Sequence, residues 1–155
     1  MNDEWTFEKL ERVIGYHFKD RSILLRGITR LAYSKEHGLP EGYHLDALAT
    51  LGDAVIEVII LTRLVQGGEH DKGAVSLKKM DLVNMSVLRE AARSIELEKY
   101  VRWGKGEAGM HVWTSGRVLA ECLEALAGAV YLDGGIGAAT KVLEQFSLLP
   151  EISGL

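Results

Sequence analysis

The segment from Leu45 to Leu64, which reads LDALATLGDAVIEVIILTRL, constrains the fold more than any other part of the chain. It begins with apolar residues at helical spacing, and from Val55 onwards apolar residues occupy nearly every face. A helix that is hydrophobic all round lies in the middle of a domain. The segment therefore predicts a central core helix around which the rest of the chain packs.

The same segment carries three acidic residues, Asp46, Asp53 and Glu57. At roughly 3.6 residues per turn, these positions fall within about 40° of one another around the helix axis. Burying a carboxylate costs free energy unless a partner compensates for its lost hydration. A stripe of three acids along a core helix therefore indicates a functional site.

The length and the net charge narrow the class of protein. A chain of 155 residues is enough for one domain that buries roughly two-thirds of its unfolded surface. We expect a single domain over residues 1–155, with a core over about 8–147 and a frayed tail over 148–155. The net charge of −4 argues against a generally basic nucleic-acid binder. It leaves room for a local basic strip, or for an acidic pocket that binds metal ions.

Cysteine usage and the N-terminal sequence indicate the compartment. The single cysteine, Cys122, excludes an internal disulfide and fits a reducing environment. The N-terminal sequence MNDEWTFEKLE is acidic and amphipathic, unlike a signal peptide. No apolar run approaches the roughly 20 residues of a membrane span. These features predict a soluble protein of the cytoplasm.

Helical signals dominate the rest of the chain, since only two prolines occur and strand-like alternation is nearly absent. We expect an all-α fold whose central helix ends at Gly67–Gly68. Loops are expected over 34–44, 69–76 and 103–115. The other helices are expected near residues 5–14, ended by Gly15; 23–28, capped by Asp20 or Ser22; 77–83, capped by Ser76; 86–95; 116–132, capped by Ser115 and closed by Gly134–Gly135; and 137–146.

A second pair of acids lies on the long apolar helix expected over 116–132. Glu121 and Glu124 are three residues apart, about 60° in azimuth and about 4.5 Å along the axis. Two such carboxylates repel each other unless a cation lies between them. If this helix and the central helix converge, their acids form an oxygen-rich pocket suited to Mg²⁺. The alternative is that the acids lie on solvated edges or pair with Arg117 or Lys105.

Four segments of the chain follow one another in a characteristic order and spacing. They read LERVIGYHFKDRSILLRGIT, LDALATLGDAVIE, LVNMSVLREAARSIELEKYVRWGKGE and VLAECLEALAGAVYLDGG. Over about residues 10–146 they resemble the endonuclease domain of the ribonuclease III family. The resemblance implies an all-α domain that forms a homodimer, with two acidic pockets flanking a cleft for double-stranded RNA. Each pocket of the family binds Mg²⁺, with Mn²⁺ as an alternative ion, and hydrolyses a phosphodiester bond.

The resemblance also assigns roles to the acids of this chain. Asp53 and Glu124 fall on the family's catalytic metal ligands. Glu121 replaces a metal-binding aspartate and is one methylene longer. Asp46 falls on the first glutamate of the family's central-helix signature, although an acid in the first turn of a helix also complements the macrodipole.

The second glutamate of that signature falls on Ala49, which removes one usual metal ligand. The short "mini" ribonucleases III, which lack a double-stranded-RNA-binding domain, show a similar sequence at this place. We hypothesise that Glu57, one turn beyond Asp53, supplies part of the missing charge as a metal ligand. A salt bridge and a dimer contact are the alternatives for Glu57.

Contacts with RNA must come mainly from the backbone of the nucleic acid, because A-form duplexes are recognised by shape and 2′-hydroxyls. Either of two basic clusters could line the cleft or simply solvate the surface. The first comprises Lys72, Lys78 and Lys79, and the second comprises Lys105, His111 and Arg117.

Two functions from different classes remain. The first is a Mg²⁺-dependent endoribonuclease that cleaves double-stranded or structured RNA, including ribosomal RNA precursors. The second is a non-catalytic ribonuclease-III-like protein that only binds RNA or ribosomes, which Ala49 favours. A protein released from catalysis has little reason to retain buried acids. The retained Asp53, Glu121 and Glu124 therefore favour the enzyme.

Overall fold

The computed structural model describes residues 3–149, and side chains from residue 6 onwards. In this part of the chain the only β-type pairing is an isolated bridge between Thr29 and Arg102, so the all-α prediction is confirmed. The α-helices are α1 (Asp3–Ile14), α2 (Arg21–Gly27), α3 (Leu31–Glu36), α4 (Asp46–Gln66), α5 (Lys72–Leu82), α6 (Met85–Ser94), α7 (Lys105–Gly109) and α8 (Gly116–Gln145). Two short 3-10 turns are η1 (Leu97–Lys99) and η2 (Val112–Thr114).

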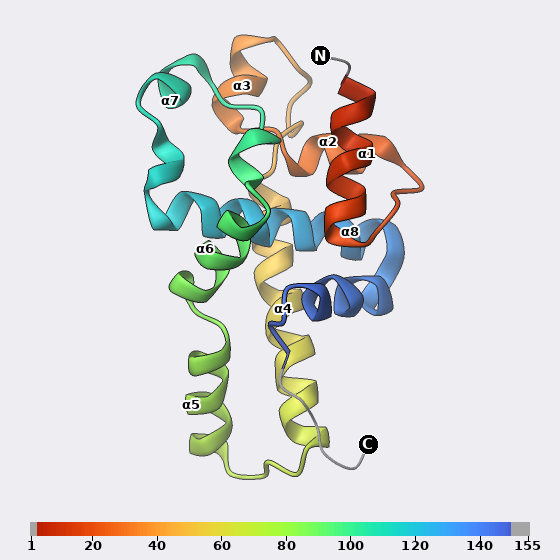
Figure 1. The fold of residues 1–155 in the computed structure, drawn as a ribbon, viewed down its shortest axis with the longest axis vertical. Helices are drawn as coiled ribbons and strands as arrows, with labels where there is room; N and C mark the ends of the chain where they lie inside the picture. The colour runs from red at the N-terminus through yellow and green to blue at the C-terminus, as the bar shows by residue number, and fades with distance from the viewer. Residues whose placement is uncertain (1–2, 150–155) are drawn as a thin grey trace.

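The helices α4 and α8 cross in the middle of the molecule and form the most extensive contact between any two of its elements (Figure 1). The other helices surround this crossing, with α2 and α6 packed against α8. The second half of α4 extends away from the crossing beside α5, so that these two helices form an arm (Figure 1). The predicted central helix therefore lies at the centre of the fold.

Two glycines allow α4 and α8 to approach until their backbones touch. A Cβ atom on Gly52 would lie 1.7 Å from the carbonyl oxygen of Glu124, and one on Gly128 would lie 2.1 Å from that of Leu48. No other residue fits at either position without moving the helices apart. Since glycine within a helix costs about 1 kcal/mol relative to alanine, close packing is the reason for both residues.

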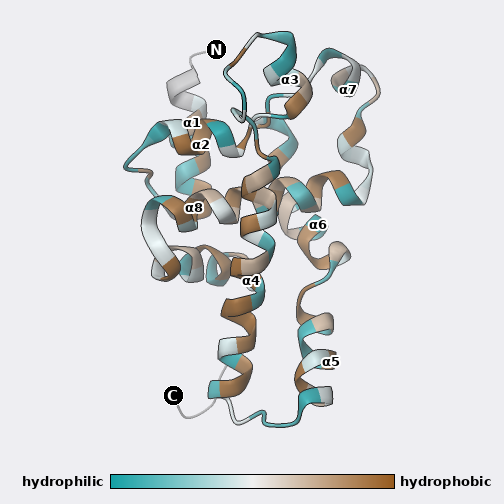
Figure 2. Ribbon diagram, turned by 180° about the vertical axis from the view of Figure 1, so that it is seen from behind, coloured by the Kyte–Doolittle hydropathy of each residue, from teal (hydrophilic) through white to brown (hydrophobic). Residues whose placement is uncertain are grey.

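The prediction that the second half of the central segment is apolar on every face and buried is correct only in part. Ile56, Ile59 and Ile60 are buried, but the side chain of Val58 is 54% exposed and Val65 is exposed as well. Figure 2 shows apolar residues along α4, including the part that extends beyond α8. The helix therefore carries an exposed apolar strip in addition to its core face.

Three predicted loops contain helices. The helix α3 begins before the loop expected over 34–44 and extends into it as far as Glu36. The helix α5 begins at Lys72 instead of following Ser76, because the carboxylate of Asp71 accepts a hydrogen bond from the Ala74 amide at 2.9 Å and caps it. The loop expected over 103–115 contains α7 and η2.

The two helices expected over 116–132 and 137–146 form α8, which bends at Gly135 with φ of +82°. Ser115 lies at the predicted N-cap position, but its side chain makes no capping hydrogen bond. Length and hydropathy alone would allow α8 to cross a membrane. Half of its most apolar 18-residue stretch is buried, however, and core packing accounts for this composition.

The N-terminal part is tied to α8 through Asp133. This carboxylate accepts hydrogen bonds from the hydroxyl of Tyr16 at 2.6 Å and from the amides of Lys19 and Asp20 at 2.8 and 3.0 Å. Asp20 caps α2 by accepting from the Ser22 amide, which confirms one of the two predicted caps. At the other end Leu148 is buried, while residues 150–155 of the expected frayed tail lie outside the described part.

Candidate functional site

The crossing of α4 and α8 brings Asp53 and Glu124 together, because Gly52 contacts the backbone of Glu124 directly. Partial burial of Glu124, a hydrogen bond with the Asp53 carboxyl group and the charges of Asp53 and Glu121 raise the pKa of Glu124 to about 8. The positive charge of Arg117 opposes this shift. The Glu124 carboxyl group is therefore largely protonated at neutral pH when no cation is bound.

A divalent cation fits this pair on chemical grounds. Mg²⁺ takes oxygen ligands and is commonly held by one or two carboxylates, with water and phosphate oxygens completing its octahedron. A cation between Asp53 and Glu124 would also offset the burial and the carboxylate repulsion that raise the pKa of Glu124. In residues 6–149 no three His, Cys, Asp or Glu side chains already converge on one metal position. The fit therefore rests on this pair, with Glu121 one turn away on α8.

Glu121 and Asp46 line a neighbouring pocket of about 400 Å³. The Oε1 atom of Glu121 lies 3.8 Å from Nη1 of Arg30, in the range of an ion pair. Asp46 is in the first turn of α4, exposed and 3.7 Å from Nδ1 of His44. The pocket therefore mixes acids and bases, and it is lined by Arg30, Leu31, Ala32, Lys35, Asp46, Glu107 and Glu121.

Glu57 lies on the other side of Asp53, and both line a pocket of about 230 Å³ with Lys79 and Val83. The Nζ atom of Lys79 donates a hydrogen bond to Glu57 Oε1 at 2.5 Å. This is the salt bridge that the sequence left open as an alternative. Ala49 is only 8% exposed and belongs to the apolar core. A metal-binding role for Glu57 in place of an acid at Ala49 stays a prediction.

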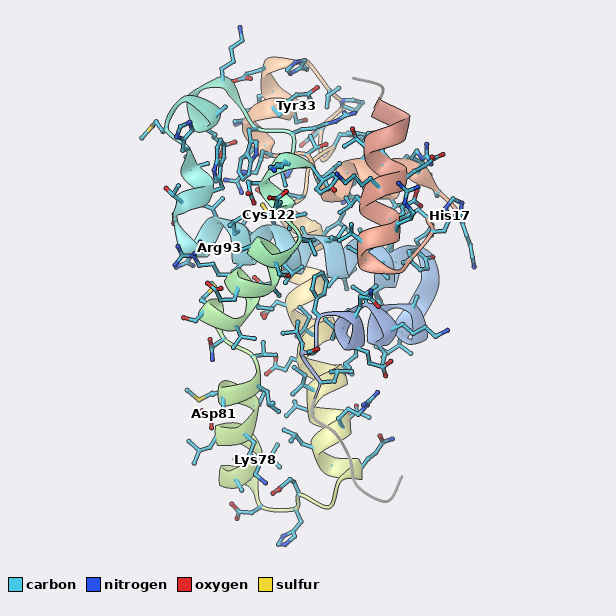
Figure 3. The ribbon with its side chains drawn as sticks, in the orientation of Figure 1. His17, Tyr33, Lys78, Asp81, Arg93 and Cys122 are labelled. Carbon is cyan, nitrogen blue, oxygen red and sulfur yellow. The ribbon has the colours of Figure 1, made fainter. Side chains whose placement is uncertain are left out.

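The two basic clusters lie far apart. The helix α5 carries Lys72, Lys78 and Lys79 on the arm, whereas α7 and the start of α8 lie beyond the crossing (Figure 1). Figure 3 shows Lys78 near the end of the arm, away from Cys122 in α8. Lys78 pairs with Glu69, and Lys79 with Glu57. Of the predicted RNA-binding residues, Arg117 acts on Glu124 through its charge, and Lys79 lines the pocket of Asp53.

The thiol of Cys122 lies next to Glu121 in sequence and is buried. Burial raises the pKa of this thiol to about 12, although Arg30 partly opposes the shift. The thiol therefore stays protonated at neutral pH and is a poor nucleophile. The chemistry of the site belongs to its carboxylates.

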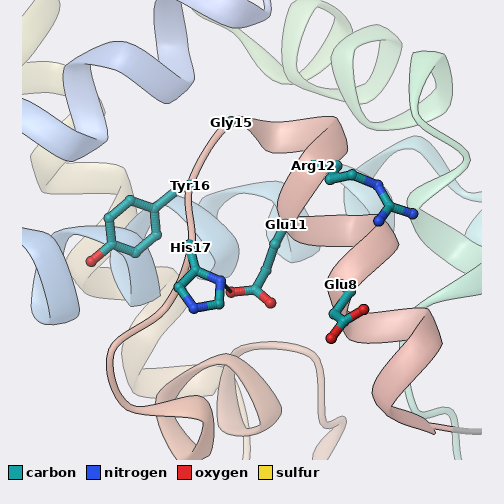
Figure 4. Close-up of a pocket in the computed structure, with 6 residues that line it drawn as sticks. All are labelled: Glu8, Glu11, Arg12, Gly15, Tyr16 and His17. Atoms are coloured by element: carbon teal, nitrogen blue, oxygen red, sulfur yellow. Dashed lines mark ion pairs between the residues drawn. The ribbon is translucent and has the colours of Figure 1, made fainter.

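Another pocket, of about 420 Å³, lies at the end of α1, and its polar contacts stabilise the fold (Figure 4). Its buried carboxylate, Glu11, accepts a hydrogen bond from the Phe18 amide at 2.6 Å and lies 3.1 Å from His17 Nδ1 and 3.4 Å from Arg21 Nη2. These bonds hold the chain reversal after α1. The pocket is lined by Glu8, Glu11, Arg12, Gly15, Tyr16 and His17.

Sequence reasoning missed two features of the site. Gly52 and Gly128 set the helix crossing, and a glycine inside an apolar helical segment is a usable signal for such an approach. Arg30 and Glu107 flank Glu121 in space, but they are far apart in the sequence. No local pattern links this pair, so only the fold reveals it.

Comparisons with known proteins agree with this geometry. Residues 20–151 match the family model described as Ribonuclease-III-like. Ribonuclease 3 of Oleidesulfovibrio alaskensis is 38% identical over 143 residues, covering 91% of this chain and 62% of that protein. Ribonuclease 3 of Carboxydothermus hydrogenoformans is 39% identical over 146 residues, covering 92% and 61%. The chain thus spans about three-fifths of the length of these relatives.

Among solved structures, the chain is similar to the nuclease domain of ribonuclease III from Campylobacter jejuni. One such structure has a TM-score of 0.80 at 26% identity and covers 90% of this chain and 94% of that one. A second has a TM-score of 0.76 at the same identity. The fold therefore matches a nuclease domain over almost its whole length.

Proposed function

Because this chain belongs to the ribonuclease-III-like family, we propose that it is a divalent-metal-dependent endoribonuclease acting on double-stranded or structured RNA. One observation carries the proposal. The glycine-mediated crossing of α4 and α8 sets Asp53 against Glu124, the two acids that the family resemblance assigns to the metal. A raised pKa at such a pair is typical of a functional site.

The acids would act as follows. Asp53 and Glu124 would hold the cation, and Glu121 would add a third carboxylate from the same helix as Glu124. When bound, Mg²⁺ or Mn²⁺ lowers the pKa of a water and neutralises the charge on the phosphate. Arg117 would contact an RNA phosphate beside this pair. Lys79 would contact the RNA backbone from the pocket that it shares with Asp53, and Lys72 and Lys78 would do so farther along α5.

The proposal includes a homodimer. An apolar pocket of about 190 Å³ lies on α4 and α8 near the acids, with Leu51, Ala54, Val55, Val58, Tyr131 and Ile136 along it. Val58, Leu132 and Ile136 are exposed, and a contiguous exposed apolar patch typically marks an interaction surface. The related Campylobacter jejuni structure concerns a region involved in dimer formation of that nuclease domain. A second copy is therefore the partner that this face fits best.

We further propose a cytoplasmic location and structured RNAs, such as ribosomal RNA precursors, as substrates. The specific observation that favours a non-catalytic, RNA- or ribosome-binding protein instead is Ala49, where the family's signature has an acid. Binding of duplex RNA without any cleavage would distinguish this second function.

The test is cleavage of end-labelled duplex RNA by the purified chain, with Mg²⁺ or with EDTA. We expect internal cleavage that requires the metal and that falls at least about 100-fold in Glu124→Gln, because metal-assisted charge stabilisation contributes several kcal/mol. Glu144→Gln is the matched control, because Glu144 lies on the same helix and pairs with Arg63. Metal-independent cleavage, or no cleavage of several structured RNAs by a folded dimer, would overturn the proposal.

A further inference from the structure

Arg30 lies beside the segment that leads into α7 and beside the start of α4. Its amide donates to the carbonyl oxygen of Arg102 at 3.1 Å, and the amide of Leu45 donates to the carbonyl of Thr29 at 2.9 Å. The helix α4 begins one residue later, at Asp46. The backbone around Arg30 is therefore fixed relative to the start of α4 before its side chain makes any contact.

The guanidinium group of Arg30 is held on one side by Glu107. Its Nε and Nη2 atoms donate to Oε2 of Glu107 at 3.0 and 2.8 Å, and the side chain is only 16% exposed. Glu107 is itself fixed, because its Oε1 accepts a hydrogen bond from the Gly104 amide at 3.2 Å. The guanidinium also lies over the Trp103 ring, 5.6 Å from its centroid. Stacking and a two-point hydrogen bond together hold an arginine in one orientation.

The remaining terminal nitrogen points toward the acids. Nη1 of Arg30 lies 3.8 Å from Oε1 of Glu121, three residues before Glu124 on α8. Arg30 therefore bridges Glu107, which anchors it, and Glu121, which belongs to the candidate metal site. Lysine, with a single charged nitrogen, cannot make this planar bridge.

We propose that Arg30 is a positioning residue that holds the Glu121 carboxylate in place beside the Asp53–Glu124 pair. The inference rests on the proposed function, because a fixed position of the Glu121 carboxylate matters only for cation binding. Glutamate has one more rotatable bond than the aspartate found here in the resembling family, and fixing that bond costs side-chain entropy. The rigid Arg30–Glu107 unit restricts the carboxylate before a cation arrives.

A double-mutant cycle on Mn²⁺ affinity, measured by calorimetry on the full chain, tests the proposal. Arg30→Lys keeps the charge but removes the bridge, so its field on the cation is largely preserved. We expect it to weaken Mn²⁺ binding about tenfold when residue 121 is glutamate, the size typical of lost outer-shell contacts. In the Glu121→Asp background the shorter side chain cannot reach Arg30. There Arg30→Lys should change the Mn²⁺ affinity by less than about twofold.

Two further variants separate positioning from folding. Glu107→Met removes both acceptor oxygens of the anchor without touching Arg30 or the acids, and it should weaken Mn²⁺ binding in the same background-dependent way. Arg102→Gln is the matched control, because Arg102 lies over the rings of Phe7 and Tyr33 and should leave Mn²⁺ affinity unchanged. Thermal melting in EDTA reports whether each variant is folded.

A metal-free readout makes the outcomes distinguishable. In the wild-type protein the Arg30 Nε–H proton should exchange slowly with water in NMR spectra, and Glu107→Met should abolish that protection. Equal effects of Arg30→Lys in both backgrounds, or an unprotected Nε–H in the wild type, would overturn the role of Arg30 while leaving the proposed function intact. A wild-type protein that neither binds Mn²⁺ nor cleaves RNA would overturn the proposed function itself, and this inference with it.

Discussion

Gly52→Ala should separate α4 from α8 and so disrupt both stability and the acid pair. The added Cβ would lie 1.7 Å from the carbonyl oxygen of Glu124, 2.6 Å from its carbonyl carbon and 2.9 Å from the amide nitrogen of Gly128. All three are backbone atoms, so no side-chain rotation can relieve the contact. Ordinary contact begins near 3.4 Å, and the carbonyl oxygen must therefore move by about 1.7 Å.

The magnitude follows from two opposing effects. Alanine would gain about 1 kcal/mol over glycine in a helix interior. Overpacking a core typically costs 1–3 kcal/mol and more where backbones clash, so a net loss of about 2 kcal/mol in the free energy of unfolding is expected. For a chain of this size, each kcal/mol corresponds to a fall in Tm of about 2–4 °C, or about 4–8 °C in all.

The assay is urea unfolding, with Gly137→Ala in α8 as the control for the same substitution at a helical glycine that has open space around it. A Cβ on Gly137 meets nothing within 4 Å, so this variant should be neutral or stabilised by up to about 1 kcal/mol. Gly52→Ala should also bind Mn²⁺ more weakly, because the shift moves Glu124 away from Asp53. Wild-type stability and wild-type Mn²⁺ affinity in Gly52→Ala would refute the argument that this crossing builds the site.

Three other results are expected. Val58→Asp places a charge in the apolar pocket of α4 and α8 and should convert a dimer into monomers by light scattering, whereas Val65→Asp, outside that pocket on the same helix, should not. Burial opposes ionisation of Asp133, but hydrogen bonds from a tyrosine hydroxyl and two backbone amides outweigh it and lower its pKa. The ionised Asp133 therefore contributes its full stabilisation above its ordinary pKa of 3.8 and loses it as pH falls through the lower pKa of the folded state. The difference in urea stability between the wild type and Asp133→Asn should therefore shrink at acid pH. Glu57→Gln should weaken Mg²⁺ binding if this acid supplies charge missing at position 49, and unchanged affinity would leave Glu57 as the salt-bridge partner of its lysine.

The long helices could be predicted from the sequence because their own apolar periodicity specifies them. The predicted central helix starts at Leu45, one residue before the observed start of α4, and Gly67 ends α4 as expected. Gly135 bends α8 at the place where the sequence predicted an end between two helices. The short helices could not be predicted in this way. The five-residue helix α7 depends on Glu107, whose carboxylate pairs with Arg30 across the fold. Such a helix has no strong local signal, because tertiary contacts supply its stability.

The same distinction between local sequence signals and tertiary contacts applies to the candidate site. The acids Asp53, Glu121 and Glu124 could be named from the sequence, since each lies on a long helix and in a segment that resembles the family. The crossing that joins two of them depends on backbone contact at Gly52, and the ion pair beside the third depends on Arg30. These are relations between distant segments, which neither helical spacing nor composition encodes.

Calorimetry of Mn²⁺ binding at pH 7 in buffers of different ionisation enthalpy tests the central claim, that Asp53 and Glu124 form a divalent cation site. Because the pKa of Glu124 is about 8 without a cation, its carboxyl group holds close to one proton at pH 7. We expect Mn²⁺ to bind and to release that proton to the buffer, and we expect both effects to disappear in Glu124→Gln. Absence of Mn²⁺ binding by the folded wild-type protein, or equal binding and proton release in Glu124→Gln, would contradict it.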